Sequence, residues 1–367
     1  MVTTRAYALV TGGGTGGHVY PALAVAEELV ARGHPSDTLR FVGARRGLEA
    51  TAVPEAGFAI DVLPGRGLQR SLRPGALRDN LVALADTARA FGAARRIIRR
   101  TRPRVVFGVG GYASLPCVVN ARLARIPTVV HEQNAAPGLA NRIAVRLGAR
   151  AAVSLPGTPL AGAVLTGNPV RRAIAAVRRQ PDPARPVVLI FGGSLGARRV
   201  NDAALGLYER WRDRDDLTVV HVSGRRDHPD CARRLDGLRR PDDRLSYTLI
   251  EYEEHFERRY AEATVALCRA GAVTVAELAV VGLPAVLVPL PGAPDDHQTR
   301  NARALTDAGG AVLIPDAAAD PDRVGETLEA LLAEPGRLPA MSDALRTLGR
   351  PDAAARVAAL VEEAADA

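Results

Sequence analysis

The sequence contains no lysine, and all 48 of its basic residues are arginine. This absence excludes enzymes that hold a substrate or cofactor as a Schiff base on lysine, and nucleotide-binding proteins with a P-loop lysine. Aromatic residues make up only 4% of the chain, so aliphatic side chains and alanine must form the core. The three cysteines lie far apart and form no CxxC pair, which excludes a disulfide framework and a zinc knuckle and is typical of a reducing compartment.

Long hydrophobic runs are also scarce. Residues 270–292 form the longest apolar stretch that could suggest a membrane span, and Glu277 is its single charged residue. One glycine and three prolines interrupt its second half, which favours a helix–turn–strand unit over a transmembrane helix. The first residues lack the length and the cleavage site of a signal peptide. We therefore expect neither a membrane-spanning segment nor a signal peptide.

Two glycine-rich turns indicate the fold. Residues 11–17 follow a β-prone run and precede a helical pattern, and residues 192–196 do the same after the apolar residues 187–191. Short apolar runs alternate with helical patterns through the rest of the chain, whose 367 residues are typical of two domains. We predict an α/β protein with two Rossmann-like domains, whose parallel sheets face each other across a cleft.

The domain boundary is expected near the turn at residues 167–169. We assign residues 1–165 to the N-terminal domain and residues 166–351 to the C-terminal domain. The final helical pattern, residues 352–367, could pack back on the N-terminal domain.

The positive charge is concentrated in one segment. The whole chain has a net charge of +8, whereas residues 66–104 alone contain eleven arginines and only two aspartates. Leucine, phenylalanine and isoleucine recur there at helical spacing. The segment is either a basic amphipathic helix suited to an anionic membrane surface or an ordinary Rossmann helix with a solvated arginine face. Nucleic acid is not expected as a partner, because interleaved aromatic residues are missing.

Several polar residues follow the glycine turns. In the first turn, glycines permit close approach of a ligand and the helix N-terminus favours negative charge, while His18 is a candidate general base or else a packing histidine. The spacing differs from a dinucleotide-binding fingerprint, which argues against a dehydrogenase. In the second turn, backbone amides and Ser194 could hold a diphosphate that Arg171 neutralises, although Arg171 could equally be a surface cation.

Other candidates lie further along the chain. Glu277 falls in the first turns of a predicted helix, where a carboxylate can bind both hydroxyls of a ribose; an unpaired buried glutamate would be costly. Gln298 has an amide that can donate to and accept from sugar hydroxyls. Tyr112 and the pair His131 and Glu132 follow predicted strands and should open toward the cleft. The pair could act in acid–base or metal chemistry, but adjacent residues of an extended chain point apart.

Seven ordered motifs together resemble the MurG family of peptidoglycan N-acetylglucosaminyltransferases, which have the GT-B fold. The motifs are GGGTGGHVYPALAVAEEL, GVGGYASLP, HEQNAAPGLANR, TGNPVRR, FGGSLGARRVN, CRAGAVTVAELAVVGLPAVLVPL and DDHQTRNARAL. The resemblance implies an inverting transfer of N-acetylglucosamine from UDP-N-acetylglucosamine to the C4 hydroxyl of the muramoyl unit of lipid I, which forms lipid II. It implies that no metal or other cofactor takes part. It also implies a peripheral enzyme on the cytoplasmic face of the cell membrane.

The resemblance also assigns roles to single residues. His18 is the candidate base. The residues implied in donor binding are Thr15, Gly16, Gly17, Asn134, Arg171, Ser194, Glu253, Ala272, Val273, Thr274, Val275, Ala276, Glu277 and Gln298. The residues implied on the acceptor side are Tyr112, His131 and Glu132.

The sequence departs from the family pattern at two places. Glu253 stands where the family usually has an apolar residue in a stretch that would frame the uracil, and the loop at residues 292–294 is slightly long. If backbone groups read the uracil, Glu253 is harmless there, although it weakens this detail of the resemblance; with the longer loop, donor specificity could shift. Three alternatives stay open: a related transferase of specialised metabolism, a UDP-sugar 2-epimerase with the same fold, and a non-enzymatic nucleotide-binding module.

Overall fold

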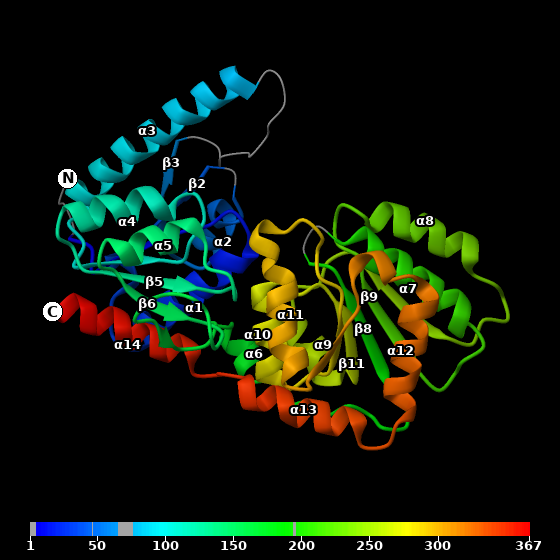
Figure 1. The fold of residues 1–367 in the computed structure, drawn as a ribbon. Helices are drawn as coiled ribbons and strands as arrows, with labels where there is room; N and C mark the ends of the chain where they lie inside the picture. The colour runs from blue at the N-terminus through cyan, green and yellow to red at the C-terminus, as the bar shows by residue number, and fades with distance from the viewer. Residues whose placement is uncertain (1–4, 46, 65–75, 194–195) are drawn as a thin grey trace. The chain divides into compact units, whose positions relative to one another are not determined.

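The structure is a computed structural model that describes residues 5–45, 47–64, 76–193 and 196–367 (Figure 1). It divides into two compact units. The first combines Met1–Arg171 with Pro351–Ala367, and the second is Arg172–Arg350. The division lies a few residues after the boundary expected from the sequence.

The first unit contains a seven-stranded sheet in the order β3-β2-β1-β4-β5-β6-β7, and all its strand pairs are parallel. Its strands are β1 (Ala8–Thr11), β2 (Leu39–Ala44), β3 (Ala59–Leu63), β4 (Val105–Gly108), β5 (Thr128–Glu132), β6 (Arg150–Val153) and β7 (Val164–Leu165). Its helices are α1 (Gly16–Ala31), α2 (Glu49–Glu55), α3 (Ala76–Thr101), α4 (Ser114–Leu123), α5 (Leu139–Arg146) and α14 (Ala353–Asp366).

Alternating side chains of the strands pack against helices on both faces of this sheet. Ala8 and Val10 of β1 lie in one apolar cluster with α1, α2 and α14. Leu9, between them, belongs to the opposite cluster with α3, α4 and α5. This alternation with period two is what a parallel sheet covered on both faces requires.

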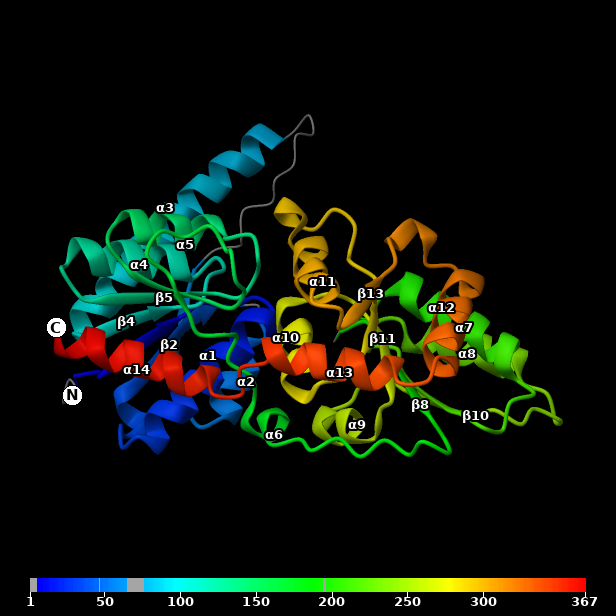
Figure 2. The same ribbon diagram turned by 60° about the horizontal axis from the view of Figure 1, so that its bottom comes forward.

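The C-terminal helix α14 packs on the first unit beside α1 (Figure 2). Val357 and Val361 of α14 are fully buried in the shared core. At the rim, Arg32 donates to Glu362 over 2.9 Å, and Arg150 donates to Glu363 over 2.8 Å. Apolar burial therefore provides most of the attachment, and the exposed ion pairs add little to it.

The second unit contains a six-stranded parallel sheet in the order β10-β9-β8-β11-β12-β13. Its strands are β8 (Val187–Phe191), β9 (Thr218–Val222), β10 (Ser246–Ile250), β11 (Val265–Cys268), β12 (Ala285–Leu287) and β13 (Ala311–Leu313). Its helices are α6 (Arg172–Ala175), α7 (Arg198–Trp211), α8 (His228–Leu238), α9 (Phe256–Glu262), α10 (Ala272–Val281), α11 (His297–Asp307), α12 (Pro321–Ala333) and α13 (Arg337–Leu348).

The expectation of two Rossmann-like units with parallel sheets is confirmed, since β1 and β8 each lie centrally with a crossover on either side. The apolar run at residues 270–292 contains α10, a turn at Gly282 and β12, as the sequence predicts. No helix in the described ranges is both long and apolar enough to cross a bilayer.

Candidate functional site

The first glycine turn connects β1 to α1. Thr15 is the N-cap residue of α1, with an extended backbone, and Gly16 and Gly17 are the first two residues of the helix. The side-chain oxygen Oγ1 of Thr15 lies 3.4 Å from Nδ1 of His18. Three of the candidate donor-binding residues and the candidate base therefore occupy one turn at the carboxyl end of a central strand. Ligands of open α/β sheets bind at this edge.

His18 lies between two loops of the first unit. Its backbone N–H donates to the carbonyl oxygen of Thr15 over 3.1 Å, so the first turn of α1 sets the position of the ring. A Cβ atom added to Gly110 would lie 3.4 Å from Nε2 of His18, which places the ring beside the loop that follows β4. The side chain is half-buried. A half-buried imidazole at a strand edge can take a proton from a hydroxyl group, as a general base does.

Glu49, the first residue of α2, was not among the sequence-based candidates, yet its carboxylate holds the first glycine turn. One carboxylate oxygen accepts the N–H of Gly14 over 2.7 Å, and the other accepts the N–H of Ala44 over 2.8 Å. The residue is only 2% exposed. The sequence contains one signal for this contact: Glu49 lies shortly after β2, the strand that neighbours β1.

The motif at residues 131–134 supports its own loop. His131 is fully buried: Nε2 lies 3.0 Å from the carbonyl oxygen of Gly167, and Nδ1 lies 3.1 Å from the amide nitrogen of Gln133. Burial lowers the pKa of His131 to about 4, so the ring is neutral at pH 7. The ring is enclosed by the chain itself and supports the loop, and its place on the acceptor side stays a prediction.

Glu132 has a similar supporting role. Its carboxylate accepts the backbone N–H groups of Asn134 (3.0 Å) and Gly138 (2.9 Å) and the side-chain amide of Asn141 (2.8 Å). These hydrogen bonds stabilise a buried charge and fold the loop between β5 and α5. Because Glu132 and His131 bond to different partners, the structure does not bring them together as an acid–base or metal pair.

The remaining first-unit candidates lie nearer the surface. The side-chain amide of Asn134 lies 3.4 Å from the carboxylate of Glu132. The hydroxyl of Tyr112 donates to the carbonyl oxygen of Pro64 over 3.1 Å, and burial raises its pKa. The guanidinium of Arg171 lies over the ring of Tyr20, 5.2 Å from the ring centre. The Arg171 side chain is therefore placed beside α1.

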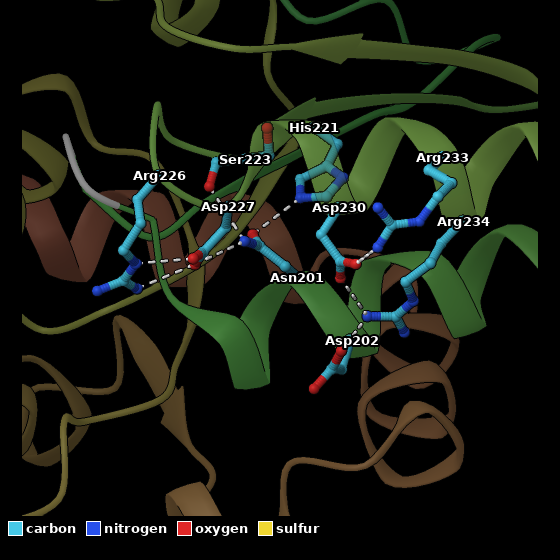
Figure 3. A network of polar contacts seen from close by, with 9 residues as sticks. All are labelled: Asn201, Asp202, His221, Ser223, Arg226, Asp227, Asp230, Arg233 and Arg234. Atoms are coloured by element: carbon cyan, nitrogen blue, oxygen red, sulfur yellow. Dashed lines mark hydrogen bonds and ion pairs between the residues drawn. The ribbon is translucent and has the colours of Figure 1, made fainter.

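A polar network lies beside the second glycine turn, which connects β8 to α7 (Figure 3). Ser194, the candidate diphosphate ligand in this turn, lies outside the described residues. The side-chain amide of Asn201 donates to the carbonyl oxygen of Ser223 over 3.0 Å and lies 3.3 Å from the carboxylate of Asp227. Any side chain on Gly196 would overlap with that carbonyl and that carboxylate.

His221 connects this network to the sheet. Its Nε2 lies 3.0 Å from the side-chain oxygen of Asn201, and its Nδ1 lies 2.8 Å from the hydroxyl of Tyr247. Burial lowers the pKa of His221 to about 3, so this ring is also neutral at pH 7. Arg226 donates to both oxygens of Asp227, over 2.7 and 3.0 Å, and neutralises the carboxylate. Sequence reasoning did not find this network, because its members come from different elements.

The segment Ala272–Glu277 forms the beginning of α10, after the N-cap residue Gly271. Glu277 is 6% exposed, and its carboxylate accepts the hydroxyl of Tyr260 over 2.9 Å. Tyr260 packs at 5.5 Å from Phe256 and at 6.1 Å from Phe191, measured between ring centres. The glutamate that the family resemblance places on the ribose is therefore held by a neighbouring aromatic cluster, as an enclosed carboxylate requires.

Glu253 and Gln298 both make local hydrogen bonds. Glu253 accepts from Arg259 over 2.7 Å and from the backbone of His255 over 2.9 Å. Burial alone would raise the pKa of Glu253, but these donors and their charges hold the pKa below its ordinary value. The side-chain oxygen of Gln298 accepts the N–H of Leu290 over 3.0 Å, so Gln298 closes the loop before α11.

Within the described ranges, no group of three or more His, Cys, Asp or Glu side chains is close enough to hold a metal ion. The independence from metals implied by the resemblance stays a prediction.

The chain belongs to glycosyltransferase family 28. The model of the N-terminal domain of this family matches residues 8–153, and the model of its C-terminal domain matches residues 187–357. The two matches correspond to the two sheets described above.

Relatives of known name are similar over nearly the full length. The chain is 43% identical over 366 residues to the UDP-N-acetylglucosamine–N-acetylmuramyl-(pentapeptide) pyrophosphoryl-undecaprenol N-acetylglucosamine transferase of Alkalilimnicola ehrlichii, covering 97% of this chain and 98% of that protein. It is 41% identical to the transferase of the same name from a Nocardioides species, covering 97% of both chains.

Solved structures agree on the fold. A crystal structure of Acinetobacter baumannii MurG superposes with a TM-score of 0.76 at 28% identity, covering 98% of this chain and 100% of that chain. A UDP-N-acetylglucosamine 2-epimerase of Listeria monocytogenes superposes with a TM-score of 0.66, but at 14% identity it shows the shared fold alone.

Proposed function

We propose that this chain transfers N-acetylglucosamine from UDP-N-acetylglucosamine to the C4 hydroxyl of lipid I and so forms lipid II for peptidoglycan synthesis. The observation that carries this proposal is the 43% identity to a transferase of that name across 97% of the chain. The geometry of the first glycine turn agrees with it, because a candidate base and a backbone turn meet at the edge of the sheet where ligands bind.

In this reaction the C4 oxygen of the acceptor attacks the anomeric carbon of N-acetylglucosamine. The bond between that carbon and the diphosphate oxygen breaks, UDP leaves with the electron pair, and the configuration at the anomeric carbon is inverted. His18 would take the proton of the hydroxyl group as the bond forms. The Thr15 hydroxyl, 3.4 Å from Nδ1, would orient the ring for this step.

The donor is expected to bind through the second unit. Glu277 would accept both ribose hydroxyls, and its hydrogen bond from Tyr260 at 2.9 Å would hold the carboxylate in position. The charge that develops on UDP would be met by backbone amides of the second glycine turn, with Ser194 and Arg171 as further ligands that the family resemblance implies. No metal ion is required in this scheme.

Peripheral binding to the anionic surface of the cytoplasmic face would bring the enzyme to its lipid-linked acceptor. In α3, Ile98 is buried in the core while Arg95, Arg96 and Arg99 are exposed. Leu123, at the end of the neighbouring α4, is 75% exposed, which is unusual for a leucine. Exposed arginines on α3 and an exposed apolar side chain on the neighbouring α4 suit binding to anionic lipid, and each arginine near such a surface adds about 1 kcal/mol.

The test is a UDP-release assay with UDP-N-acetylglucosamine, run with and without a lipid I analogue. We expect release that depends on the acceptor, together with a disaccharide product. Conversion of the donor to an epimer without any acceptor would instead identify an epimerase. Release with an unrelated acceptor but not with the lipid I analogue would identify a transferase of another pathway.

A further inference from the structure

The first glycine turn has a structural partner that neither the motifs nor the relatives point to. Glu49 opens α2, and α2 follows the strand β2, which pairs with β1 in parallel. Its carboxylate accepts the N–H of Gly14, in the connection after β1, and the N–H of Ala44, the last residue of β2. Glu49 therefore joins the connection after β1 to the end of β2 by charge-assisted hydrogen bonds.

Three glycines surround this carboxyl group. A side chain on Gly13, Gly43 or Gly47 would overlap with the carboxyl end of Glu49. Gly13 also has a φ of +151°, a backbone conformation that L side chains rarely adopt. The glycines leave room for one carboxylate close to the backbone, so this side chain fits a cage built for it.

Gly14, which donates its N–H to Glu49, immediately precedes the N-terminus of α1, where His18 lies. Thr15 follows it as the N-cap residue, and the carbonyl oxygen of Thr15 accepts the N–H of His18 over 3.1 Å. A displacement of Gly14 therefore moves Thr15 and, through it, the imidazole ring. Misplacement of a reacting group by about 1 Å can cost a hundredfold in rate.

We propose that Glu49 is a positioning residue of the transferase: its caged carboxylate holds the turn Gly14–Thr15 and thereby sets the place of His18. The inference rests on the proposed function, because turnover is one of its readouts. Glu49 itself contacts neither reacting group. Its loss should lower kcat strongly and leave the affinity for UDP within about twofold of wild type, since UDP lacks the sugar that Thr15, Gly16 and Gly17 would contact.

The first experiment compares Glu49→Gln with wild type. Glutamine keeps the size of the side chain but can accept only through its oxygen, so its NH₂ group opposes one of the two backbone N–H groups. We expect kcat to fall at least tenfold while the affinity for UDP stays within about twofold of wild type. The matched control is Glu55→Gln, at the exposed end of the same helix, which should behave as wild type. Wild-type kcat in Glu49→Gln would overturn the proposal.

The second experiment uses Glu49→Ala and sodium formate, with ionic strength matched by sodium chloride. The truncation empties the cage and exposes two N–H donors that suit a small carboxylate. Formate should raise the kcat of Glu49→Ala in a saturable way and leave wild type and Glu55→Ala unchanged. Folded Glu49→Ala that does not respond to formate would contradict the proposal; if this variant does not fold, Glu49→Gln alone decides.

A third measurement separates this inference from the proposed function. Hydrogen exchange of the peptide that contains Gly14 and Thr15 should become faster in Glu49→Gln than in wild type or Glu55→Gln. This readout needs no substrate. If wild type releases no UDP, the proposed function fails, and unchanged exchange in Glu49→Gln would separately show that Glu49 does not hold the turn.

Discussion

The two glycine-rich turns occupy the same place in their sheets, but different chemistry holds them. Each follows a central strand, β1 or β8, and each is supported from the connection after the neighbouring strand, β2 or β9. In the first unit a caged carboxylate, Glu49, bonds directly to the backbone of the turn. In the second unit a carboxylate paired with arginine, Asp227, lies beside Gly196 within a network of neutral side chains.

The comparison shows that the topology of the sheet dictates where the support of each turn comes from but not which side chains provide it. Parallel order places the end of the neighbouring strand beside each turn, so the support must come from there. In the first turn a carboxylate accepts a backbone N–H directly, whereas beside the second turn the side-chain amide of Asn201 donates to the carbonyl oxygen of Ser223, which lies close to Gly196. We expect the first turn to serve proton transfer and to contact the transferred sugar, and the second turn to bind the diphosphate.

The largest expected effect concerns the candidate base in the first turn. His18→Ala should lower kcat by about 10²- to 10⁴-fold, the usual contribution of a general base, while the affinity for UDP stays unchanged. Steady-state kinetics and titration with UDP measure the two quantities. A variant that retains wild-type kcat would remove His18 from the mechanism.

The next largest effect concerns the residues of the second unit that are expected to bind the nucleoside. Glu277→Ala should raise the KM for the donor about 10- to 100-fold, because hydrogen bonds to a charged group are worth about 1.5–3 kcal/mol each. Tyr260→Phe removes only the hydroxyl that bonds to Glu277 and should raise the donor KM about fivefold. If Tyr260→Phe weakens donor binding as much as Glu277→Ala does, Tyr260 itself contacts the donor.

A smaller effect concerns the buried histidines that support a loop in each unit. The pKa values of His131 and His221 are lowered to about 4 and about 3, below the unfolded value of 6.5. Below about pH 6.5 the unfolded chain therefore binds more protons than the folded protein. The contribution of these histidines to the free energy of unfolding is complete above about pH 6.5 and is lost as the pH falls toward the folded pKa values. The urea concentration at the midpoint of unfolding should decrease between pH 6.5 and pH 5. His221→Gln should make this dependence of the midpoint on pH less steep. An unchanged dependence on pH would show that His221 is already protonated in the folded protein.

The smallest effect concerns the membrane. Replacing Arg95, Arg96 and Arg99 together with Gln should weaken sedimentation with anionic vesicles in low salt while the affinity for UDP stays unchanged. The matched control replaces the same number of exposed arginines in the second unit, Arg233, Arg239 and Arg240. Equal loss of binding in both variants would show that only net charge matters. Unchanged binding in the α3 variant would show that its arginines form only a solvated face.

The sequence predicted the central strands well and the edges poorly. The runs at residues 105–108, 187–191 and 218–222 predict strands with the bounds that the structure has. The strands β3, β6, β10 and β13 are not predicted; polar residues interrupt the edge strands β3 and β10, whereas β13 lies in the apolar run at residues 311–314. The pattern of residues 171–179 predicts a short helix, but the helix is limited to Arg172–Ala175, and Arg179 donates to the carbonyl oxygen of Ala263 over 2.8 Å.

The sequence places the start of α1 too late, because Pro21 is typical of a helix start, whereas the helix begins at Gly16 and contains Pro21 in its second turn. Pro21 is the sixth residue of α1 and lies beyond the N–H groups that lack a partner within the helix, so it removes one hydrogen bond from the second turn. Gly16 and Gly17 are typical of a loop, so the sequence does not predict that they form the first turn of the helix α1.

The candidate site was predictable only where one motif contained it. Thr15, Gly16, Gly17 and His18 are consecutive and do lie in one turn. Glu49 and Tyr260 could not be found this way, because Glu49 reaches Gly14 across 35 residues and Tyr260 reaches Glu277 across 17. Their roles follow from packing between elements, which periodicity and motifs do not encode.

The division of labour between the first glycine turn and the nucleotide-binding residues of the second unit is tested most directly by titrating UDP into three proteins by calorimetry: wild type, Glu49→Ala and Glu277→Ala. UDP lacks the transferred sugar, so it reports the nucleotide side alone. We predict that Glu277→Ala weakens UDP binding at least tenfold, while Glu49→Ala binds UDP within about twofold of wild type although its turnover has fallen. Weakening of UDP binding by Glu49→Ala to the same extent as by Glu277→Ala would contradict the account.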